Sequence, residues 1–522
     1  MATNGESKPK AAKFAGMEVP PDLTKGNFFF LYFNTLIAGM LMGMPAIVQP
    51  AFLNDIVKID QQFAGSINGL LQNMSQIATL LFVALVGVLS DKVGRKILAF
   101  AGFLVIAVFL FLMSQASGIA SGLNMPAGLS SAICALLSFM PGKAAEFAEF
   151  SPALLITYIT RFVIGIGLVL AYPQFITMVA DYTYEKDRGK GMAMNGVCMG
   201  IASILVFAIC APIQKQTGVV ILMYILATIS FAGAVCSWGF LKDRLPDIKK
   251  QQAGLKEIIP VVRKSLPLKA TYWCSLITRA DIVILATFLV AWGVKYGQEV
   301  EMAAKDATMK AALPMLVMSV VSLVAFPVLG VMLDKWGRVP TILLSLVSAT
   351  VGMLLLAVSP TPFSGLVYLA VIFAAVGMAG SIAGANTLAS DVSPKGMLGS
   401  ILGGLNTMQP IGILFFMGVG GYLFDAFGPG WAFGLKGIAT LVLAAWMFMV
   451  KGALVGEIAE KTSLDGLPFA LPWDEEAKKM LEKVPAAFRE AAVSGTEDYA
   501  RQHSHETVTA EVMAAYRKEL GM

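Results

Sequence analysis

The sequence predicts an all-α membrane protein with twelve transmembrane helices in two pseudo-symmetric six-helix halves, plus a small soluble helical C-terminal domain. Three observations lead to this class. Hydrophobic residues make up 57% of the 522 positions and charged residues only 14%, a balance that does not suit a water-soluble surface. Apolar runs of about 20 residues, the length that crosses a bilayer, recur up to about residue 450. A charged motif also occurs twice, at equivalent places in the chain.

Each apolar run is expected to be a helix, because a backbone in lipid has no water to bond and must satisfy its own hydrogen bonds. The expected spans cover residues 28–51, 65–89, 97–115, 153–180, 191–213, 217–241, 270–294, 311–333, 340–358, 364–390, 396–424 and 431–451. The expected divisions are an N-terminal tail (1–27), a first half (28–241), a central linker (242–269), a second half (270–455) and a tail domain (456–522).

Lys and Arg residues are spread unequally over the two sides of the expected membrane protein. The tail and loops on one side carry about three times as many of them as the loops on the other side. Positive charge is retained on the cytoplasmic side, so we expect both termini in the cytoplasm and the chain in a bacterial inner membrane. The net charge of +5 is therefore a topology signal, and no nucleic-acid partner is expected.

A polar sequence, GVLSDKVGRK at 87–96, interrupts this apolar chain, and GVMLDKWGR at 330–338 repeats it with a constant offset of 243 residues. Each copy stands in the short cytoplasmic turn after the second span of its half. A fixed offset between equivalent positions indicates a duplicated six-helix unit. The matching residues are Gly87, Asp91, Lys92, Gly94 and Arg95 in the first copy and Gly330, Asp334, Lys335, Gly337 and Arg338 in the second.

A second pair of motifs supports the duplication with a different offset, 210 residues. The first half therefore contains about 33 additional residues, which the external segment 116–150 supplies. This segment is expected either to pack as an external cap or to form an interfacial or re-entrant helix over 126–140 that gates the outer mouth. The matching motif residues are Asp181 and Arg188 after span four and Asp391 and Lys395 after span ten.

Both copies of the turn, the RFVIGIG stretch at 161–167 and the D…RG junction after span four resemble the major facilitator superfamily of secondary transporters. The resemblance covers about residues 25–455 and implies alternating access, with spans one, four, seven and ten around a central cavity. It also implies that the Asp and Arg of each turn form a cytoplasmic charge cluster, which latches the inward gate while the carrier faces outward. The alternative for the basic residues is that they only fix the topology.

Departures from that family narrow the range of substrates. The Gly-Pro-rich stretch that proton-antiporting drug exporters carry in span five is missing, since residues 199–213 read MGIASILVFAICAPI. The signatures of sugar porters after spans six and twelve are also absent. Drug export and sugar transport are therefore disfavoured.

Three ionisable residues were identified inside the expected spans: Arg161 in span four, and Arg279 and Asp281 in span seven. A charge at bilayer depth costs several kcal/mol unless it is paired or hydrated, which suggests a function. Arg279 and Asp281 point about 200° apart on a helix and cannot pair directly. We expect Arg161 and Asp281 to act in substrate or proton coupling between the halves; the alternative is a structural ion pair. Asn34 and Asn386, on cavity-type spans, are further substrate candidates.

The composition changes after residue 455 to that of a soluble segment with an excess of acidic residues. Apolar residues at helical spacing predict two or three short helices over residues 473–520, with Pro485 ending or kinking one and Thr509 capping another. The stretch beginning LPWDEEAKKMLEKV resembles the small C-terminal helical domain found in one of the subunits of light-independent protochlorophyllide reductase. No catalytic body of that enzyme and no cluster-ligating cysteine set accompany it, so it implies a docking or regulatory module with a protein partner.

No cofactor, metal centre or enzymatic activity is expected from this sequence. The five cysteines form no close pair, and four of them lie in spans, which favours buried apolar roles. His503 and His505 form an H-x-H that could bind a metal, but two histidines in an expected loop are more often bystanders.

The leading interpretation is a secondary active transporter of a small solute, working by alternating access in the bilayer. Proton coupling is open, and two arginines against one carboxylate within the spans weakly favour an organic anion as the substrate. The rival interpretation is a carrier-like protein that no longer transports and serves as an assembly factor or sensor, linked through its tail to a tetrapyrrole pigment.

Overall fold

The structure is a computed structural model that describes residues 12–138, 140–184, 187–244, 255–394, 397–462, 464, 467–482, 484 and 486–519. Within these residues, twelve helical stretches are long and apolar enough to cross a membrane, so the predicted number of spans is confirmed. The stretches are Lys25–Val57, Gln61–Val93, Arg95–Ser114, Ser151–Tyr182, Arg188–Thr217, Val219–Phe240, Leu266–Glu299, Ala304–Lys335, Arg338–Ala357, Gly365–Val392, Leu398–Phe427 and Pro429–Met449.

Several spans are built from more than one helix. The first half contains α1 (Lys25–Gly43), α2 (Pro45–Phe52), η1 (Leu53–Val57), η2 (Gln61–Phe63), α3 (Ala64–Val93), α4 (Arg95–Ser114), α7 (Ser151–Tyr182), α8 (Arg188–Leu205), η5 (Val206–Cys210), α9 (Ala211–Thr217) and α10 (Val219–Phe240). The second half contains α12 (Leu266–Thr278), α13 (Asp281–Glu299), α14 (Ala304–Lys335), α15 (Arg338–Ala357), α16 (Gly365–Val392), α17 (Leu398–Phe427) and α18 (Pro429–Met449).

Other short elements lie outside these spans. They are β1 (Lys13–Phe14), β2 (Met17–Glu18), α5 (Ala116–Gly122), α6 (Ala127–Leu137), η3 (Pro141–Phe147), α11 (Leu255–Lys264), α19 (Lys451–Thr462), α20 (Glu475–Glu482), α21 (Ala486–Gln502) and α22 (Ala510–Glu519). The two strands pair as an antiparallel hairpin, which the sequence did not predict. Phe14 of this hairpin stacks on Tyr32 at the start of span one, with 6.1 Å between the ring centroids.

Several of the helices extend beyond both ends of the apolar runs that predicted them. Span one was predicted over 28–51 and occupies Lys25–Val57, because hydropathy marks the lipid core while a helix continues until a cap or a turn stops it. At its beginning, the Thr24 hydroxyl accepts a hydrogen bond from the Asn27 amide at 3.3 Å, and the Asn27 side chain accepts one from the Thr24 amide at 2.7 Å. This reciprocal capping box defines the N-terminal end of α1.

The first span of each half is interrupted. Pro45 begins α2 directly after α1, and span seven is broken between Thr278, where α12 ends, and Asp281, where α13 begins. A helix N-terminus carries a partial positive charge, so an acidic residue in its first turn is stabilised there. The break therefore places Asp281 at a favourable electrostatic position in the middle of a span.

The internal repeat extends to side-chain packing. A Cβ added at Gly167 of α7 would lie 2.7 Å from Ile106 Cγ1 and 2.9 Å from the Gly102 oxygen, both on α4. In the second half, a Cβ at Gly377 of α16 would lie 2.6 Å from Ala349 Cα on α15. Gly377 follows Gly167 by 210 residues and Ala349 follows Ile106 by 243, the two offsets of the motifs. The same close helix contact is thus made in each half.

The inserted segment 116–150 folds into α5, α6 and η3; α6 packs against η3, and both α5 and α6 pack against α7. The helix predicted over 126–140 occurs as α6, and its 11 residues are too few to cross a bilayer. Cys134 on one face of α6 is fully buried, whereas Leu129 and Leu136 on the opposite face are exposed. The segment is a packed cap that keeps an apolar outer face.

The tail domain contains three short helices, α20 to α22, where the sequence predicted two or three. They enclose a small core in which the indole Nε1 of Trp473 donates to the buried carboxylate of Glu497 at 3.0 Å. The Thr509 hydroxyl accepts from the Val512 amide at 3.4 Å, which is the predicted cap of α22. Pro485, which we expected to end a helix, lies outside the described residues.

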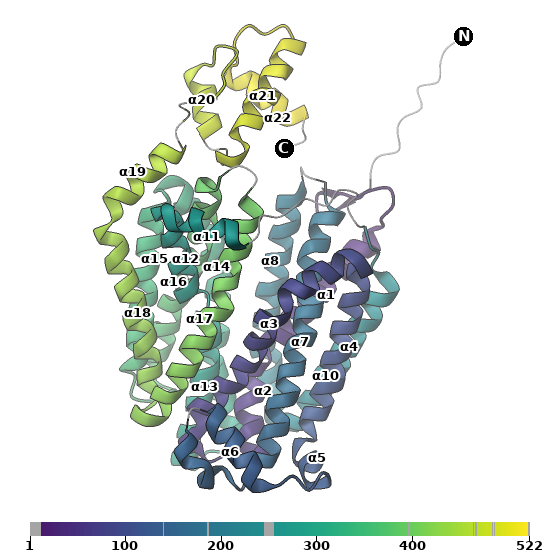
Figure 1. The fold of residues 1–522 in the computed structure, drawn as a ribbon, viewed down its shortest axis with the longest axis vertical. Helices are drawn as coiled ribbons and strands as arrows, with labels where there is room; N and C mark the ends of the chain where they lie inside the picture. Colours follow the sequence, from purple (N-terminus) through teal and green to yellow (C-terminus); the bar gives the residue numbers. More distant parts are fainter. Residues whose placement is uncertain are drawn as a thin grey trace.

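The two halves lie side by side and are joined mainly at one end of the membrane domain (Figure 1). The extensive contacts between them are those of α3 with α17, α2 with α13, and α8 and α9 with α14. The cap segment lies at this end, and the N-terminal hairpin and tail domain lie at the other (Figure 1). The tail domain sits over the end of the second half, where α19 contacts α12 and α21 contacts α16.

The Gly167 contact gives a test of the packing. We expect Gly167→Ala to destabilise the protein by about 1–3 kcal/mol, because the added methyl group forces α4 and α7 apart. Thermal unfolding in detergent measures the change. Gly239→Ala is the matched control, since nothing lies within 4 Å of its added Cβ. Equal unfolding temperatures for the two variants would contradict the packing described here.

Candidate functional site

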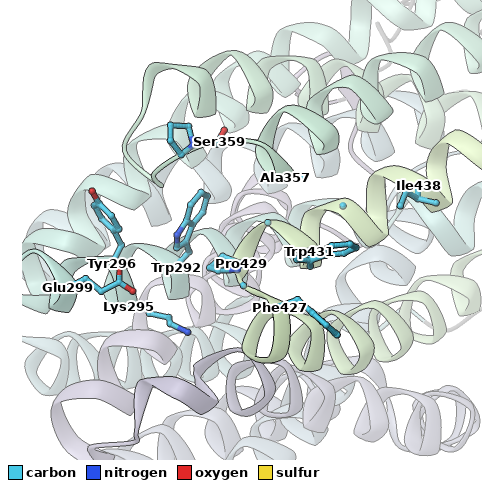
Figure 2. A pocket seen from close by; sticks show the side chains of 14 residues that line it. Trp292, Lys295, Tyr296, Glu299, Ala357, Ser359, Phe427, Pro429, Trp431 and Ile438 are labelled. Carbon is cyan, nitrogen blue, oxygen red and sulfur yellow. The ribbon is translucent and has the colours of Figure 1, made fainter.

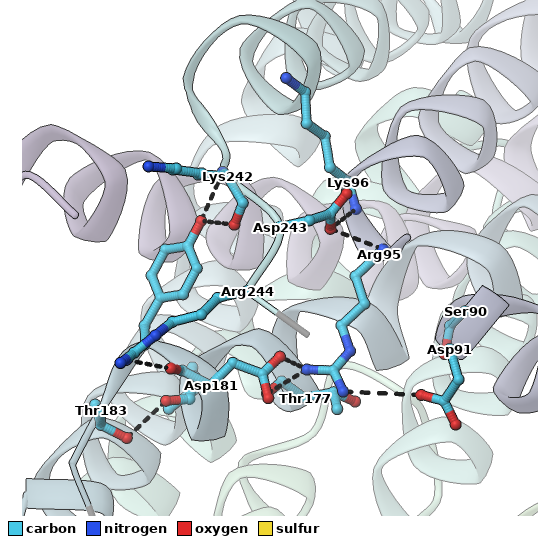
Figure 3. Close-up of polar contacts among 12 residues, drawn as sticks. Ser90, Asp91, Arg95, Lys96, Thr177, Asp181, Thr183, Lys242, Asp243 and Arg244 are labelled. Carbon is cyan, nitrogen blue, oxygen red and sulfur yellow. Dashed lines mark hydrogen bonds and ion pairs between the residues drawn. The ribbon is translucent and has the colours of Figure 1, made fainter. Parts of the chain in front are cut away.

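A cluster of charged residues surrounds Arg95 at the end of the first half that carries the hairpin (Figure 3). The Arg95 side chain is 5% exposed and forms ion pairs with Asp181 of α7 and, at 3.9 Å, with Asp91 of α3. Its Nη1 also donates to the Thr177 carbonyl at 3.4 Å. The two different motifs of the first half thus meet, because Asp91 and Arg95 come from the turn and Asp181 from the end of span four.

Asp243 belongs to the same cluster and was missed by the sequence analysis. Its Oδ1 accepts from the backbone amides of Arg95 at 2.8 Å and Lys96 at 2.9 Å, so it caps the N-terminus of α4 (Figure 3). Gly94 precedes that terminus with φ +100°, a backbone conformation that residues with a side chain rarely adopt. In the sequence, Asp243 is only an acidic residue shortly after span six, and nothing there indicates that it binds the start of α4.

The second half repeats the geometry around Arg338. Its Nε lies 2.8 Å from Asp391 Oδ2 of α16 and its Nη1 lies 2.7 Å from Asp334 Oδ1 of α14. The Arg338 side chain is 24% exposed, more than Arg95, and a Cβ at Gly337 would find its nearest atom, in Pro340, at 3.8 Å. The second cluster is therefore more open to solvent than the first.

The remaining motif residues take no direct part in these pairs. Arg188 begins α8 and is exposed, and Gly87 and Gly330 have open space where a Cβ would be. Lys395, the expected counterpart of Arg188, lies outside the described residues.

The tail domain reaches the second charge cluster. Arg489 of α21 donates to the Val484 carbonyl at 2.7 Å and to the Glu482 carbonyl at 2.6 Å, and it lies near enough to Asp391 for their charges to attract. Burial lowers the pKa of the Arg489 guanidinium, an effect that the carboxylates of Asp391 and Glu482 oppose. Asp391 thus faces a cation from its own half, Arg338, and one from the tail.

Arg161 is enclosed within the first half. It is almost fully buried on α7, and its Nη2 donates to Gln72 Oε1 of α3 at 3.3 Å. The cavity beside it has a volume of about 10 Å³, with Gln49 and Met113 among its lining residues. That volume holds about one water molecule and no solute.

Arg279 lies at the break in span seven and contacts two other helices. Its Nη1 donates to Asn406 Oδ1 of α17 at 2.5 Å, and its Nη2 donates to Asn386 Oδ1 of α16. The Nε atom is buried and has no hydrogen-bond partner among the described residues. Asn406 is itself exposed, and Gly403, one turn before it, faces open space. Arg279 is itself only 8% exposed, so it lies behind the exposed side chain of Asn406 with one donor unpaired among the described residues.

Asn34, the other predicted substrate residue, does not join this group. It is fully buried in α1, and its amide atoms have no hydrogen-bond partner among the described residues.

Asp281 forms an ion pair, the alternative that the sequence left open, with a partner that the sequence analysis did not identify. Its Oδ1 lies 2.5 Å from Lys436 Nζ of α18, and both side chains are fully buried. Lys436 also donates to the Ile277 carbonyl, which the break in span seven leaves free, and lies 4.9 Å from the centre of the Phe416 ring. The sequence analysis named three ionisable residues inside the spans and overlooked Lys436, which lies within predicted span twelve. The pair holds α13 to α18 inside one half.

A larger cavity, of about 560 Å³, opens elsewhere on the second half, at the end that joins the two halves (Figure 2). Trp292 and Tyr296 of α13 line one side, and Phe427 and Trp431 line the other. Such aromatic side chains are typical of the boundary between lipid and water. None of the intramembrane charges described above lines this cavity.

The histidine pair has ordinary contacts. The His503 ring lies 3.0 Å from the Tyr499 carbonyl and stacks on the Tyr499 ring, with 4.1 Å between centroids. Within the described part of the chain, no group of three His, Cys, Asp or Glu side chains is placed to hold a metal ion.

Two family models match the chain. The model of the Major Facilitator Superfamily matches residues 31–307 and 305–494, which together cover most of the chain. The model described as the proto-chlorophyllide reductase 57 kD subunit matches residues 473–517. Both resemblances drawn from the sequence are thereby confirmed.

Individual relatives agree with these matches. Magnetosome protein MamH of Paramagnetospirillum magneticum is 27% identical over 416 residues, which are 80% of this chain and 90% of MamH. Magnetosome protein MamZ of Magnetospirillum gryphiswaldense is 26% identical over 84% of this chain, which spans 65% of MamZ. The tail is 38% identical over 66 residues to a light-independent protochlorophyllide reductase chain of Chlorobium phaeobacteroides, covering 13% of this protein and 12% of that reductase chain.

Solved transporter structures share the fold. The nucleoside transporter NupG aligns with a TM-score of 0.61 at 14% identity, over 82% of this chain and 99% of NupG. The peptide transporter POT in complex with sulfate aligns with a TM-score of 0.60 at 14% identity, over 86% of this chain and 97% of POT. At these identities the likeness concerns the fold alone.

The Asp281–Lys436 pair gives a stability test. We expect Lys436→Met to destabilise the protein by about 3–5 kcal/mol, because it leaves a buried carboxylate without its partner. The double variant Lys436→Met with Asp281→Asn removes both charges and should recover most of that loss. Thermal unfolding in detergent measures both. A double variant no more stable than Lys436→Met alone would show that the pair is not what determines stability there.

Proposed function

This chain belongs to the Major Facilitator Superfamily, and from that premise we propose that it is a secondary active transporter that carries a small solute by alternating access. The family match, the twelve spans and the fold shared with nucleoside and peptide transporters support this class. We propose a bacterial inner membrane with both termini in the cytoplasm, which the excess of Lys and Arg on the side of the termini supports.

We propose that the conformation described here faces the cytoplasm. The halves make their extensive contacts toward the external end, through α3 with α17 and α2 with α13. At the cytoplasmic end, Arg95 and Arg338 each pair with carboxylates of their own half. In our proposal these two clusters approach each other when the carrier turns outward, and act as its inward latch. The pairs with the exposed carboxylates of Asp91 and Asp334 are worth about 1 kcal/mol or less each, so these can break in every cycle.

We propose an organic anion as the substrate and Arg279 as its main binding residue. The observation that carries this proposal is the position of Arg279 at the break in span seven. There Asn386 and Asn406 fix its guanidinium, and its buried Nε–H has no partner among the described residues. A guanidinium offers several donors in one plane, which suits a carboxylate or phosphate. Arg161 is a weaker candidate because its cavity is too small for a solute.

Proton coupling through Asp281 requires an additional step. The carboxylate is neutralised by Lys436 within the same half, so it can take up a proton only after that pair separates. In our proposal the pair acts first as a structural contact between α13 and α18, and a coupling role depends on its opening during transport.

We propose that the tail domain regulates transport through the second charge cluster. Glu457 of α19 accepts from the Leu266 amide at the start of α12, at 3.0 Å, and pairs with Lys461 at 2.7 Å; Lys461 in turn donates to Ser265. Arg489 lies near Asp391 at the end of α16. The tail is thus attached where spans seven and ten meet the cytoplasm. The match of residues 473–517 to a protochlorophyllide reductase family supports a second candidate function, that of a pigment-linked sensor or assembly factor.

The substrate proposal predicts a loss of anion binding in Arg279 variants. We expect Arg279→Gln to weaken binding of the transported anion about 10- to 100-fold, because a charge-assisted hydrogen bond is worth about 1.5–3 kcal/mol. Arg279→Lys should retain part of the affinity. Uptake of radiolabelled mono- and dicarboxylates into proteoliposomes is the measurement.

Lys269→Gln is the control for the Arg279 variants, since it removes the same charge from the same span, ten residues earlier. Equal uptake by Arg279→Gln and Lys269→Gln would contradict the role of Arg279. Uptake restricted to cationic or neutral solutes would contradict the substrate class.

The tail proposal separates the two candidate functions. Truncation after Thr462 keeps α19 and removes α20 to α22. A regulatory tail predicts that uptake continues with altered kinetics, and that Arg489→Ala alone produces a shift in the same direction. Unchanged kinetics in both variants would contradict regulation. A full-length protein that transports nothing while its tail binds protochlorophyllide would favour the sensor.

A further inference from the structure

Asp425, near the external end of α17, caps a helix of the other half. Its Oδ1 accepts from the Gly65 amide and its Oδ2 from the Ser66 amide, both at 2.7 Å. Gly65 and Ser66 stand in the first turn of α3. The two oxygens of one carboxylate thus hold two backbone donors that lie about 360 positions earlier in the sequence.

This contact is favourable because a single carboxylate accepts hydrogen bonds from two backbone amides at the start of a helix. The first four backbone amides of a helix have no acceptor within the helix. Normally a side-chain oxygen of the residue just before the helix accepts a hydrogen bond from one of them. The residue that precedes α3, Phe63, has no such oxygen and makes no side-chain cap. Asp425 supplies both acceptors instead, and its negative charge lies at the positive end of the helix dipole.

Close backbone packing surrounds the cap. A Cβ added at Gly65 would lie 2.6 Å from the Gly421 oxygen, and one added at Gly421 would lie 2.6 Å from the Gly65 oxygen. One turn further along α3, a Cβ at Gly69 would overlap the Met417 carbonyl. Small residues at facing positions let two membrane helices approach at backbone distance. The α3–α17 contact is therefore both capped and closely packed.

Two other polar contacts between the halves at this end are more exposed. Lys215 Nζ lies 3.0 Å from Asp306 Oδ1, and both side chains are at least one-third exposed. Gln298 donates to Asn54 Oδ1 at 2.6 Å in an exposed position. Exposed pairs of this kind contribute little because water and salt screen them. The partly buried carboxylate of Asp425 differs from them because it satisfies two main-chain donors at once.

We propose that Asp425 is the external latch of the carrier, the residue that holds the outer gate closed in the cytoplasm-facing state. This proposal rests on alternating access as the proposed function. Opening the outer gate must separate α3 from α17, which breaks both hydrogen bonds and exposes the amides of Gly65 and Ser66 to water. Asp425 therefore sets part of the balance between the two orientations, with no contact to the substrate.

Distance measurements between spin labels test the latch without transport or a known substrate. Leu123→Cys in the first half and Val358→Cys in the second provide two exposed external sites away from the latch. The full-length chain is labelled in nanodiscs, with Cys236→Ser to remove the cysteine that is not fully buried. Asp425→Ala should raise the ratio of long to short distances about 2- to 30-fold, the range that corresponds to loss of a helix cap.

Further variants separate the carboxylate from the packing. Asp425→Asn retains a single acceptor oxygen and should give a smaller shift than Asp425→Ala. Asp306→Asn removes an exposed carboxylate that also joins the halves and should change the ratio less than about twofold. Gly69→Ala should open the external end through its added methyl group, whereas Gly239→Ala should not.

Each outcome bears on the proposal. If Gly69→Ala lengthens the distance and Asp425→Ala does not, packing alone holds the gate and the latch role of Asp425 is overturned. If Asp425→Ala and Asp306→Asn give equal shifts, the capping geometry is irrelevant and the proposal fails likewise. If no variant changes the distance, both alternating access and the latch are contradicted. If Asp425→Ala does not fold, Asp425→Asn decides by its shift relative to Asp306→Asn.

Discussion

A bilayer core offers no water to polar groups, so every charge inside this protein depends on a partner from the protein itself. Lys436 and Asp281 neutralise each other within the second half, and the break in span seven adds the free carbonyl of Ile277 to the pair. Arg279, two residues before Asp281, is held by two asparagine side chains. The interrupted helix serves both groups, because Asp281 faces Lys436 of α18 after the break, while Arg279 before it faces asparagines of α16 and α17.

Carboxylates at helix N-termini recur in this structure with different consequences. Asp243 caps α4 inside the first half, where the cap stiffens the charged turn around Arg95. Asp425 caps α3 from the other half, so the same chemistry there depends on how the halves are oriented. A cap within one rigid unit contributes equally to both orientations of a carrier, whereas a cap between the units favours only one of them.

The two charged turns show the limits of the internal symmetry. Both place an arginine between the aspartate four residues earlier and the aspartate at the end of span four or ten. Only the first of these arginines lies beside a capping aspartate, Asp243, and is almost fully buried. The second shares its carboxylate, Asp391, with Arg489 of the tail. The tail is therefore attached at the more open of the two clusters, where a further cation can still reach the shared carboxylate.

The sequence by itself determined the twelve spans, the duplicated halves, the family and the helical tail, because hydropathy, helix length and motif offsets are local or periodic properties of the chain. It also identified Arg279, Asp281 and the residues of the two charged turns. Only the tertiary structure decided the partners: Lys436 for Asp281, Asp243 for the start of α4, and Asp425 for the start of α3. These residues lie between about 150 and 360 positions from their partners. A lone charge in a sequence reveals that a partner is required, and the folded chain alone reveals which residue supplies it.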